Sequence, residues 1–200
     1  MTKSVDMIYF RELAAQNPKD ICRRASCRYD DEKKSYTLSV WGEEYAIYPY
    51  EHQINRITKN FQRPHEFFYL FIIYYLLKSK RIKISNEWIS EKDIPGGVTF
   101  FRGPHEIPTR FISSRYKNNI DGFRKKCEQL RGIPLDMADA AYRFVITSNI
   151  PVAVLYWAGD DDFPPESKIL YDKSITEILM PDIVFALAVE ICAKIGGSDG

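Results

Sequence analysis

The sequence is poor in cysteine, with only four in 200 residues, at positions 22, 27, 127 and 192. A disulfide framework in a chain of this size would need more, so this usage fits a reducing compartment. Cys22 and Cys27 are separated by four residues, a spacing found in some zinc and cluster sites. The sequence has no second pair and no nearby histidine to complete four ligands. We therefore expect structural or incidental thiols.

The sequence also lacks a secretion signal and a membrane span. Asp6, Arg11 and Glu12 interrupt the N-terminal segment, which has no apolar region and no small-residue cleavage pattern. The most apolar segment, residues 67–77, is shorter than the roughly 20 residues that a membrane helix needs. These features predict a cytoplasmic protein with no membrane partner.

Neither sign of charge is in excess, because 28 Lys and Arg are balanced by 27 Asp and Glu. A net charge of +1 creates no field that would recruit nucleic acid, so no nucleic-acid partner is expected. The motifs GxSxG, GxxxxGK[ST] and GxGxxG are missing too, which removes the common hydrolase, phosphate-loop and dinucleotide-binding classes. An unusual enzyme stays open.

Apolar residues, by contrast, are abundant and regularly spaced. Residues 36–48 alternate on both sides of Gly42 and Glu43, which predicts a β-hairpin with these two residues in the turn. The unbroken apolar run at residues 67–77 predicts a helix buried on all sides, with Pro64 in its first turn. Further helices are predicted at residues 7–15, 19–26, 110–116, 119–130 and 182–194, and further strands at residues 139–147 and 151–157.

Strands grouped between helices are typical of an α+β fold. We expect a single domain at residues 1–195 with one antiparallel sheet, which contains the 36–48 hairpin and a strand pair at residues 142–157. The apolar helices at residues 67–77 and 182–194 would cover this sheet. Residues 196–200 would form a flexible tail.

The most distinctive stretch is residues 149–172, where an apolar strand leads into three consecutive aspartates, Asp160, Asp161 and Asp162. Asp160 and Asp162 with Glu166 are the candidate ligands for a divalent cation, and His105 is the candidate base. The spacing does not match a calcium loop, and consecutive aspartates point in different directions. The favoured interpretation is that the carboxylates cap and hydrate a turn.

A second group of residues suggests a pocket. The adjacent glycines Gly96 and Gly97 allow positive φ angles or close backbone approach. Trp88 and Trp157 precede the two turns that carry the glycines and the aspartates. We therefore expect a ligand-binding site lined by Trp88, Gly96, Gly97, Trp157, Asp160 and Asp162.

Several landmarks together resemble the prokaryotic domain of unknown function numbered 3786. The landmarks are the Gly42 hairpin, Tyr74-Tyr75-Leu76-Leu77, the segment from Glu87-Trp88-Ile89-Ser90 to Pro95-Gly96-Gly97, Tyr156-Trp157-Ala158-Gly159-Asp160-Asp161-Asp162-Phe163-Pro164 and Ile169-Leu170-Tyr171-Asp172. The resemblance covers residues 20–195. It brings no known activity with it.

Some relatives are joined to an iron–sulfur module, so the resemblance implies a corrinoid or iron–sulfur protein of anaerobes as the partner. This chain departs from that arrangement, because it has no cysteine cluster and should hold no iron–sulfur centre itself. In relatives the position of Tyr171 is often Phe, which implies that its hydroxyl is not required.

Three functions therefore remain from the sequence. The first is a ligand- or partner-binding accessory protein. The second is a divalent-metal-dependent enzyme that uses the turn at Asp160, Asp161 and Asp162. The third is a structural or scaffolding protein that forms a homo-oligomer through a self-complementary surface.

Overall fold

The computed structural model describes residues 5–58 and 63–197, and the strands in these ranges form two antiparallel sheets. The first sheet has the order β1-β2-β3-β4 and the second has the order β5-β9-β8-β7-β6. The predicted α+β class is confirmed. The strands of the first sheet are β1 (Arg28–Asp30), β2 (Ser35–Val40), β3 (Glu43–Tyr48) and β4 (Gln53–Arg56), and those of the second are β5 (Trp88–Ile89), β6 (Ile133–Leu135), β7 (Ala140–Thr147), β8 (Ile150–Trp157) and β9 (Glu166–Asp172).

The prediction of one sheet is wrong, because the hairpin and the strand pair at residues 142–157 lie in different sheets. The hairpin β2-β3 pairs with β1 on one side and β4 on the other, so short neighbouring strands occupy both of its edges. The pair β7-β8 is likewise flanked by β6 and β9. Each pair therefore forms its strand ladders with local strands, and in the described residues no ladder joins the two pairs.

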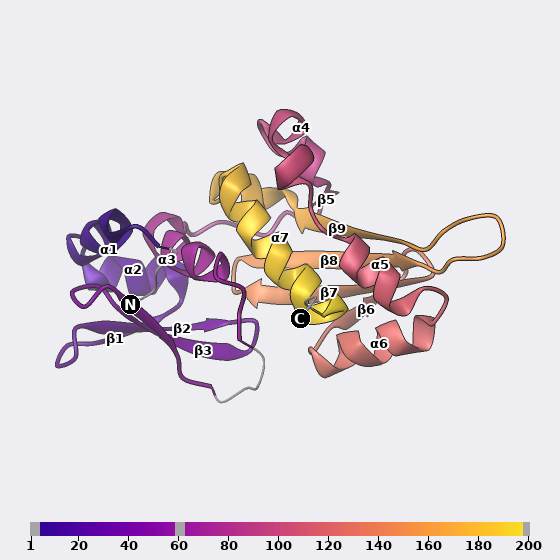
Figure 1. Ribbon diagram of the computed structural model, residues 1–200. Helices are drawn as coiled ribbons and strands as arrows, with labels where there is room; N and C mark the ends of the chain where they lie inside the picture. The colour runs from indigo at the N-terminus through magenta and orange to yellow at the C-terminus, as the bar shows by residue number, and fades with distance from the viewer. Residues whose placement is uncertain (1–4, 59–62, 198–200) are drawn as a thin grey trace.

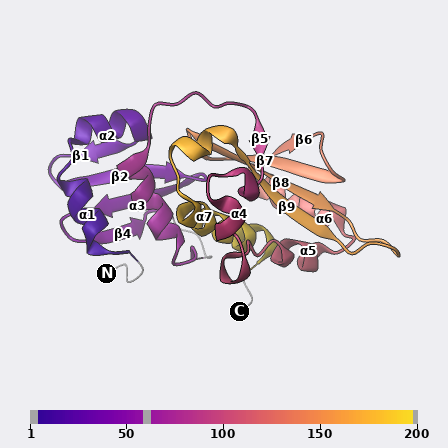
Figure 2. The same ribbon diagram turned by 90° about the horizontal axis from the view of Figure 1, so that it is seen from above.

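Helices cover one face of each sheet (Figure 1). The helices α1, α2 and α3 lie over the first sheet, α5 and α6 lie over the second, and α7 packs against both α3 and α5. Figure 2 shows α7 between the two halves of the molecule. The helices are α1 (Met7–Ala14), α2 (Pro18–Ala25), α3 (Phe68–Lys78), α4 (Gly97–Phe100), α5 (Arg110–Tyr116), α6 (Ile120–Gln129) and α7 (Pro181–Gly196), with 3-10 turns η1 (Glu91–Asp93), η2 (Gly103–His105) and η3 (Lys173–Glu177).

One continuous hydrophobic core joins the two halves, and α3 is at its centre. Every residue from Phe71 to Leu77 is buried, which confirms the predicted burial on all sides for this part of the helix, whereas Phe67 before it is exposed. Burying one such side chain contributes roughly 1.5–3 kcal/mol. Pro64 is not in the first turn, because the helix begins at Phe68. Among the described residues, no helix is long and apolar enough to cross a membrane.

The hairpin turn consists of Trp41 and Gly42, one residue earlier than predicted. Both residues have positive φ angles, 49° and 73°, as a two-residue turn between twisted strands requires. Tertiary contacts hold Trp41 in this conformation, since its N–H donates to Ile146 O at 2.7 Å and its indole N–H donates to Leu130 O at 3.3 Å. Glu43 therefore belongs to β3, where it pairs with Val40 and is buried.

The end of the chain also differs from the prediction. Gly196 is the last residue of α7 and is buried, so it does not belong to a flexible tail. A Cβ atom at Gly196 would lie 2.5 Å from Phe111 C, so the glycine allows α7 to approach α5 closely. Gly197 caps α7, because its N–H donates to Ala193 O at 2.9 Å, and the remaining residues of the predicted tail, 198–200, lie outside the described residues.

Candidate functional site

The three aspartates lie in the exposed loop between β8 and β9. Asp160 Oδ1 accepts hydrogen bonds from the N–H groups of Asp162, at 2.9 Å, and Phe163, at 2.7 Å. The N–H of Asp160 in turn donates to Phe163 O at 2.9 Å. These contacts form an Asx turn, in which the carboxylate replaces a backbone acceptor. The capping role that the sequence favours is therefore present at Asp160.

The residues proposed to bind a metal are not gathered around a common centre. Asp160 is committed to its own turn, while Glu166 is the first residue of β9 and pairs with Trp157 of β8. In residues 5–58 and 63–197, no group of three or more His, Cys, Asp or Glu side chains is arranged to hold a metal ion. The ring of His105 stacks on Phe100 at 4.5 Å and meets the edge of Phe185 on α7.

The two tryptophans predicted to line a pocket lie on the face of the second sheet that turns away from the helices. Trp88 and Trp157 pack with Leu170 against a small cluster that includes Ala153 and Leu155. The alternation of β8 explains this position, because Val152, Val154 and Tyr156 belong to the main core instead. The structure thus brings the tryptophans to one cluster.

The two glycines shape a different region. Gly96 has φ 80° and precedes α4, and a Cβ atom at Gly97 would lie only 2.0 Å from Glu91 O. The turn η1 before them is held by Ser90, whose N–H and hydroxyl donate to Asp93 Oδ2 at 2.8 and 2.7 Å. These hydrogen bonds lower the pKa of the Asp93 carboxyl. The result is a tight double turn beside β9.

A polar cleft of about 650 Å³ lies between this double turn and β9. Phe101 and Ile107 contribute apolar surface, and Thr109 lies in the wall at the start of α5. No ionisable side chain of the cleft forms an ion pair or a side-chain hydrogen bond with another described residue. These ionisable side chains are Glu91, Lys92, Arg102, Glu106, Glu166 and Lys168.

The wall that β9 contributes is an edge with no paired strand, although Ser167 and Ile169 on it are buried. The neighbouring strand β5 pairs only with Tyr171 and Asp172, so the first five residues of β9 have no strand on that side. The Ser167 hydroxyl donates to Thr109 O at 2.7 Å and fixes this part of β9 against the start of α5. Of the residues proposed from the sequence, only Glu166 lines the cleft, and Gly97 supports its opposite wall.

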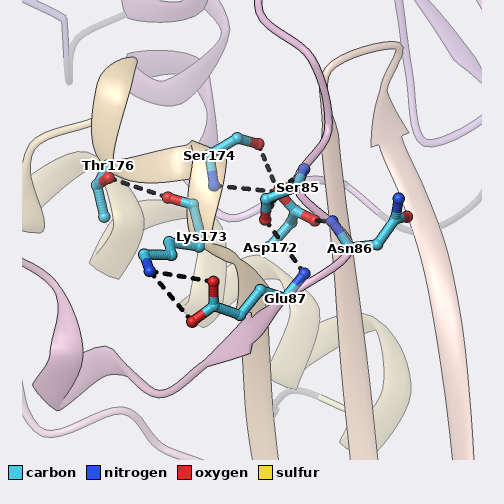
Figure 3. Close-up of polar contacts among 7 residues, drawn as sticks. All are labelled: Ser85, Asn86, Glu87, Asp172, Lys173, Ser174 and Thr176. Carbon is cyan, nitrogen blue, oxygen red and sulfur yellow. Dashed lines mark hydrogen bonds and ion pairs between the residues drawn. The ribbon is translucent and has the colours of Figure 1, made fainter.

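Asp172, at the C-terminal end of β9, holds the second sheet to the segment that connects α3 with β5 (Figure 3). Asp172 Oδ1 accepts from both the N–H and the hydroxyl of Ser85 and of Ser174, at 2.6–3.0 Å, and Oδ2 accepts from Asn86 N–H at 2.7 Å. Partial burial raises the pKa of Asp172, but the hydrogen bonds from Ser174 and Ser85 outweigh it and the net shift is downward. Asp172 also caps η3.

A buried ionic cluster joins the first sheet to α7. Glu43 Oε1 lies 2.9 Å from Lys194 Nζ, and Glu43 Oε2 lies 3.6 Å from Arg56 Nη1. Glu190 Oε2 accepts from the N–H of His65 at 2.7 Å, and its other oxygen lies 3.8 Å from Lys194 Nζ. Burial raises the pKa of Glu190 to about 7.

Sequence reasoning missed both the cleft and this cluster. Glu43 was predicted to lie in the hairpin turn, so its burial was not expected. Glu190 and Lys194 are charged residues four positions apart in an apolar helix, a signal that could have indicated a buried pair. No feature of the sequence indicated that part of β9 lacks a strand partner, since this depends on the length of β5.

The comparisons with known proteins agree with the resemblance. A family model described as "Domain of unknown function (DUF3786)" matches residues 17–194. The search of curated proteins and the search of solved structures found no match. The match spans the cleft, Asp172 and the buried ionic cluster, and the chain therefore belongs to the DUF3786 family.

Proposed function

We propose that this protein is a ligand- or partner-binding accessory protein and that the cleft beside β9 is its binding site. The observation that carries the proposal is the concentration of three cations and three carboxylates in one cleft without ion pairs among them. All of these side chains except Glu91 are exposed to water, so they are accessible to a ligand that enters the cleft. Their arrangement here favours a ligand that brings both signs of charge.

The geometry gives less support to the alternatives. A divalent-metal enzyme at the acidic turn would need carboxylates to converge, and the Asx turn instead engages Asp160 with its own backbone. The scaffolding alternative has no specific support. A corrinoid or iron–sulfur protein as the partner remains part of the proposal, and membership of the family is its only support.

The proposal is tested by nuclear magnetic resonance on the ¹⁵N-labelled protein with three probes at millimolar concentration. The probes are the dipeptide Glu-Lys, which has both charged side chains, acetate, and methylammonium. We expect the dipeptide alone to shift the amide resonances of Lys92, Arg102 and Lys168. Lys168→Glu should abolish the shifts, whereas Lys125→Glu, a matched change on exposed α6, should preserve them. Equal responses to all three probes, or shifts elsewhere, would remove the proposal.

A further inference from the structure

The C-terminal end of α2 brings two thiols into contact. Ser26 has φ 54°, and the N–H of Cys27 donates to Cys22 O at 3.3 Å. A left-handed residue followed by this hydrogen bond is the Schellman type of helix end, in which the side chains of the two hydrogen-bonded residues frequently meet in an apolar contact. Here both side chains are thiols, and their Sγ atoms lie 3.7 Å apart.

The position of this pair suits a disulfide. The bond needs two Cα atoms within about 7 Å and a sulfur separation of about 2.05 Å. The backbone hydrogen bond between Cys22 and Cys27 already holds the two main chains together, so rotation of the side chains can join the sulfurs. Both residues are half-buried, whereas Cys127 and Cys192 are 0% exposed in the main core. In residues 5–58 and 63–197, no third His, Cys, Asp or Glu completes a metal site with the pair.

We propose that Cys22 and Cys27 form a reversible redox pair, which a small-molecule disulfide such as glutathione disulfide oxidises to an intramolecular disulfide. The inference is independent of the cleft. The Cys22 sulfur attacks the reagent, one glutathione thiol leaves, and a mixed disulfide forms on Cys22. The Cys27 sulfur then attacks the Cys22 sulfur, and the second glutathione leaves with the Cys27 proton. The protein loses two electrons and two protons, and the reagent gains both.

The surroundings of the two sulfurs set the order of these steps. Burial and the neighbouring Cys22 raise the pKa of the Cys27 thiol, so Cys27 keeps its proton while Cys22 attacks first. The contribution of Cys22 depends on its negative charge, and this charge is lost when Cys22 enters the mixed disulfide. The second attack is then intramolecular between neighbouring sulfurs, which favours it over attack by another glutathione.

The disulfide would restrain a junction between the two halves of the molecule. It closes a loop that contains Arg24, whose Nη2 donates to Leu76 O on α3 at 3.0 Å. The carbonyl oxygen of Arg24 accepts from Asn149 Nδ2, in the turn between β7 and β8, at 3.3 Å. Oxidation should therefore make opening of this helix end rarer.

The test equilibrates the wild-type protein with glutathione redox buffers, quenches it with acid and measures its intact mass. We expect a mass about 2 Da lower with no bound glutathione, a peptide map that joins Cys22 to Cys27, and full reversal by dithiothreitol. Cys27→Ala should instead retain one glutathione on Cys22. Cys127→Ala, the same change at a core cysteine, should still lose about 2 Da. Free thiols or a persistent mixed disulfide in the wild-type protein at every glutathione ratio, or a disulfide that maps to other cysteines, would overturn the proposal.

Hydrogen exchange of the wild-type protein measures the restraint and needs no variant to fold. The amides of Ser26 and Cys27 both donate to Cys22 O. Their exchange should be tenfold or more slower in the oxidised protein than in the reduced protein, whereas amides of α6 should exchange equally in both. Equal exchange of the Ser26 and Cys27 amides in the two forms would overturn the restraint of the junction.

Discussion

Lys194 Nζ lies 2.9 Å from Glu43 Oε1, and this ion pair joins the last helix to the first sheet across 151 positions of sequence. Both side chains are about nine-tenths buried. Lys194 Nζ also lies 5.1 Å from the centre of the Trp41 ring, so its charge is enclosed by a carboxylate and an aromatic face. The pair thus connects the two halves of the molecule at the hairpin turn.

Glu43→Gln is expected to destabilise the protein by about 3–5 kcal/mol, because it removes the buried carboxylate that pairs with both Lys194 and Arg56. Glu44→Gln is the matched control, since the neighbouring Glu44 pairs with Arg28 at the surface and should contribute less than about 1 kcal/mol. Urea unfolding monitored by circular dichroism measures both. Similar losses for the two variants would show that the buried cluster adds nothing beyond a surface ion pair.

The pH dependence of stability should carry the signature of Glu190, whose pKa is about 7 in the folded protein and about 4.5 in its ordinary environment. The folded state holds this proton more tightly than the unfolded state does. Stability from this group is therefore fully present below pH 4.5 and is lost as the pH rises to about 7, by about 3 kcal/mol in total.

Glu190→Gln removes that titration and should flatten the decline between pH 4.5 and 7. The measurement is the free energy of unfolding of both proteins across this range. Glu43, Lys194, Arg56 and Tyr45 surround Glu190 in both proteins, so their contributions largely cancel in the difference. A difference that does not vary with pH would contradict the assignment to Glu190.

Asp172→Ala should lower the free energy of unfolding by about 3 kcal/mol. The Oδ1 atom that it removes accepts hydrogen bonds from two N–H groups and two hydroxyls, and the buried Ser174 loses its partner. Asp161→Ala, the same change in the exposed acidic turn, should cost less than about 0.5 kcal/mol. Folding lowers the pKa of Asp172. Its contribution to stability is therefore fully present at a pH above the ordinary pKa of the group, and it is lost as the pH falls through the lowered pKa of the folded protein. Chemical unfolding at neutral and acidic pH tests both statements.

Gly97→Ala should destabilise the double turn beside the cleft by about 2 kcal/mol or more, because the new methyl group meets the backbone oxygen of Glu91 at 2.0 Å. Gly42→Ala, in the hairpin turn away from the cleft, meets only the flexible Arg131 side chain at 3.4 Å and costs mainly the strain of its positive φ, about 1 kcal/mol. Thermal unfolding and binding of the Glu-Lys dipeptide are the measurements. Weaker dipeptide binding is expected for Gly97→Ala. Equal behaviour of the two variants would count against a supporting role for Gly97.

Asp160→Ala should cost about 1 kcal/mol through loss of the Asx turn, whereas Asp162→Ala should change stability by less than about 0.5 kcal/mol. Millimolar magnesium, calcium or zinc should leave the melting temperature of the wild-type protein unchanged. A rise in melting temperature that disappears in both variants would restore the metal-dependent alternative. Differential scanning fluorimetry provides these data.

Local chemistry explains why many elements were predictable. Asn17 caps α2 by accepting from Lys19 N–H at 2.9 Å, and Pro18 occupies the first helical position, where both residue types are favoured. The Asx turn at Asp160 follows from the same preference of short polar side chains for nearby N–H groups. The site was less predictable. Glu166, predicted as a metal ligand, lines the cleft and Gly97 supports its wall, but Lys92, Arg102 and Lys168 come from segments whose proximity no local pattern reveals.

The sequence by itself determined the α+β class, the family, and the position of most helices and strands, because periodicity and caps act over a few residues. Only the tertiary structure decided that there are two sheets, that Glu43 is buried opposite Lys194, and that part of β9 lacks a strand partner. Moving a two-residue hairpin turn by one position slides the strand register by two residues, so Leu38 pairs with Tyr45 where the predicted turn would pair it with Ile47. Strand partners and open edges depend on contacts between distant segments, which alternation alone does not specify.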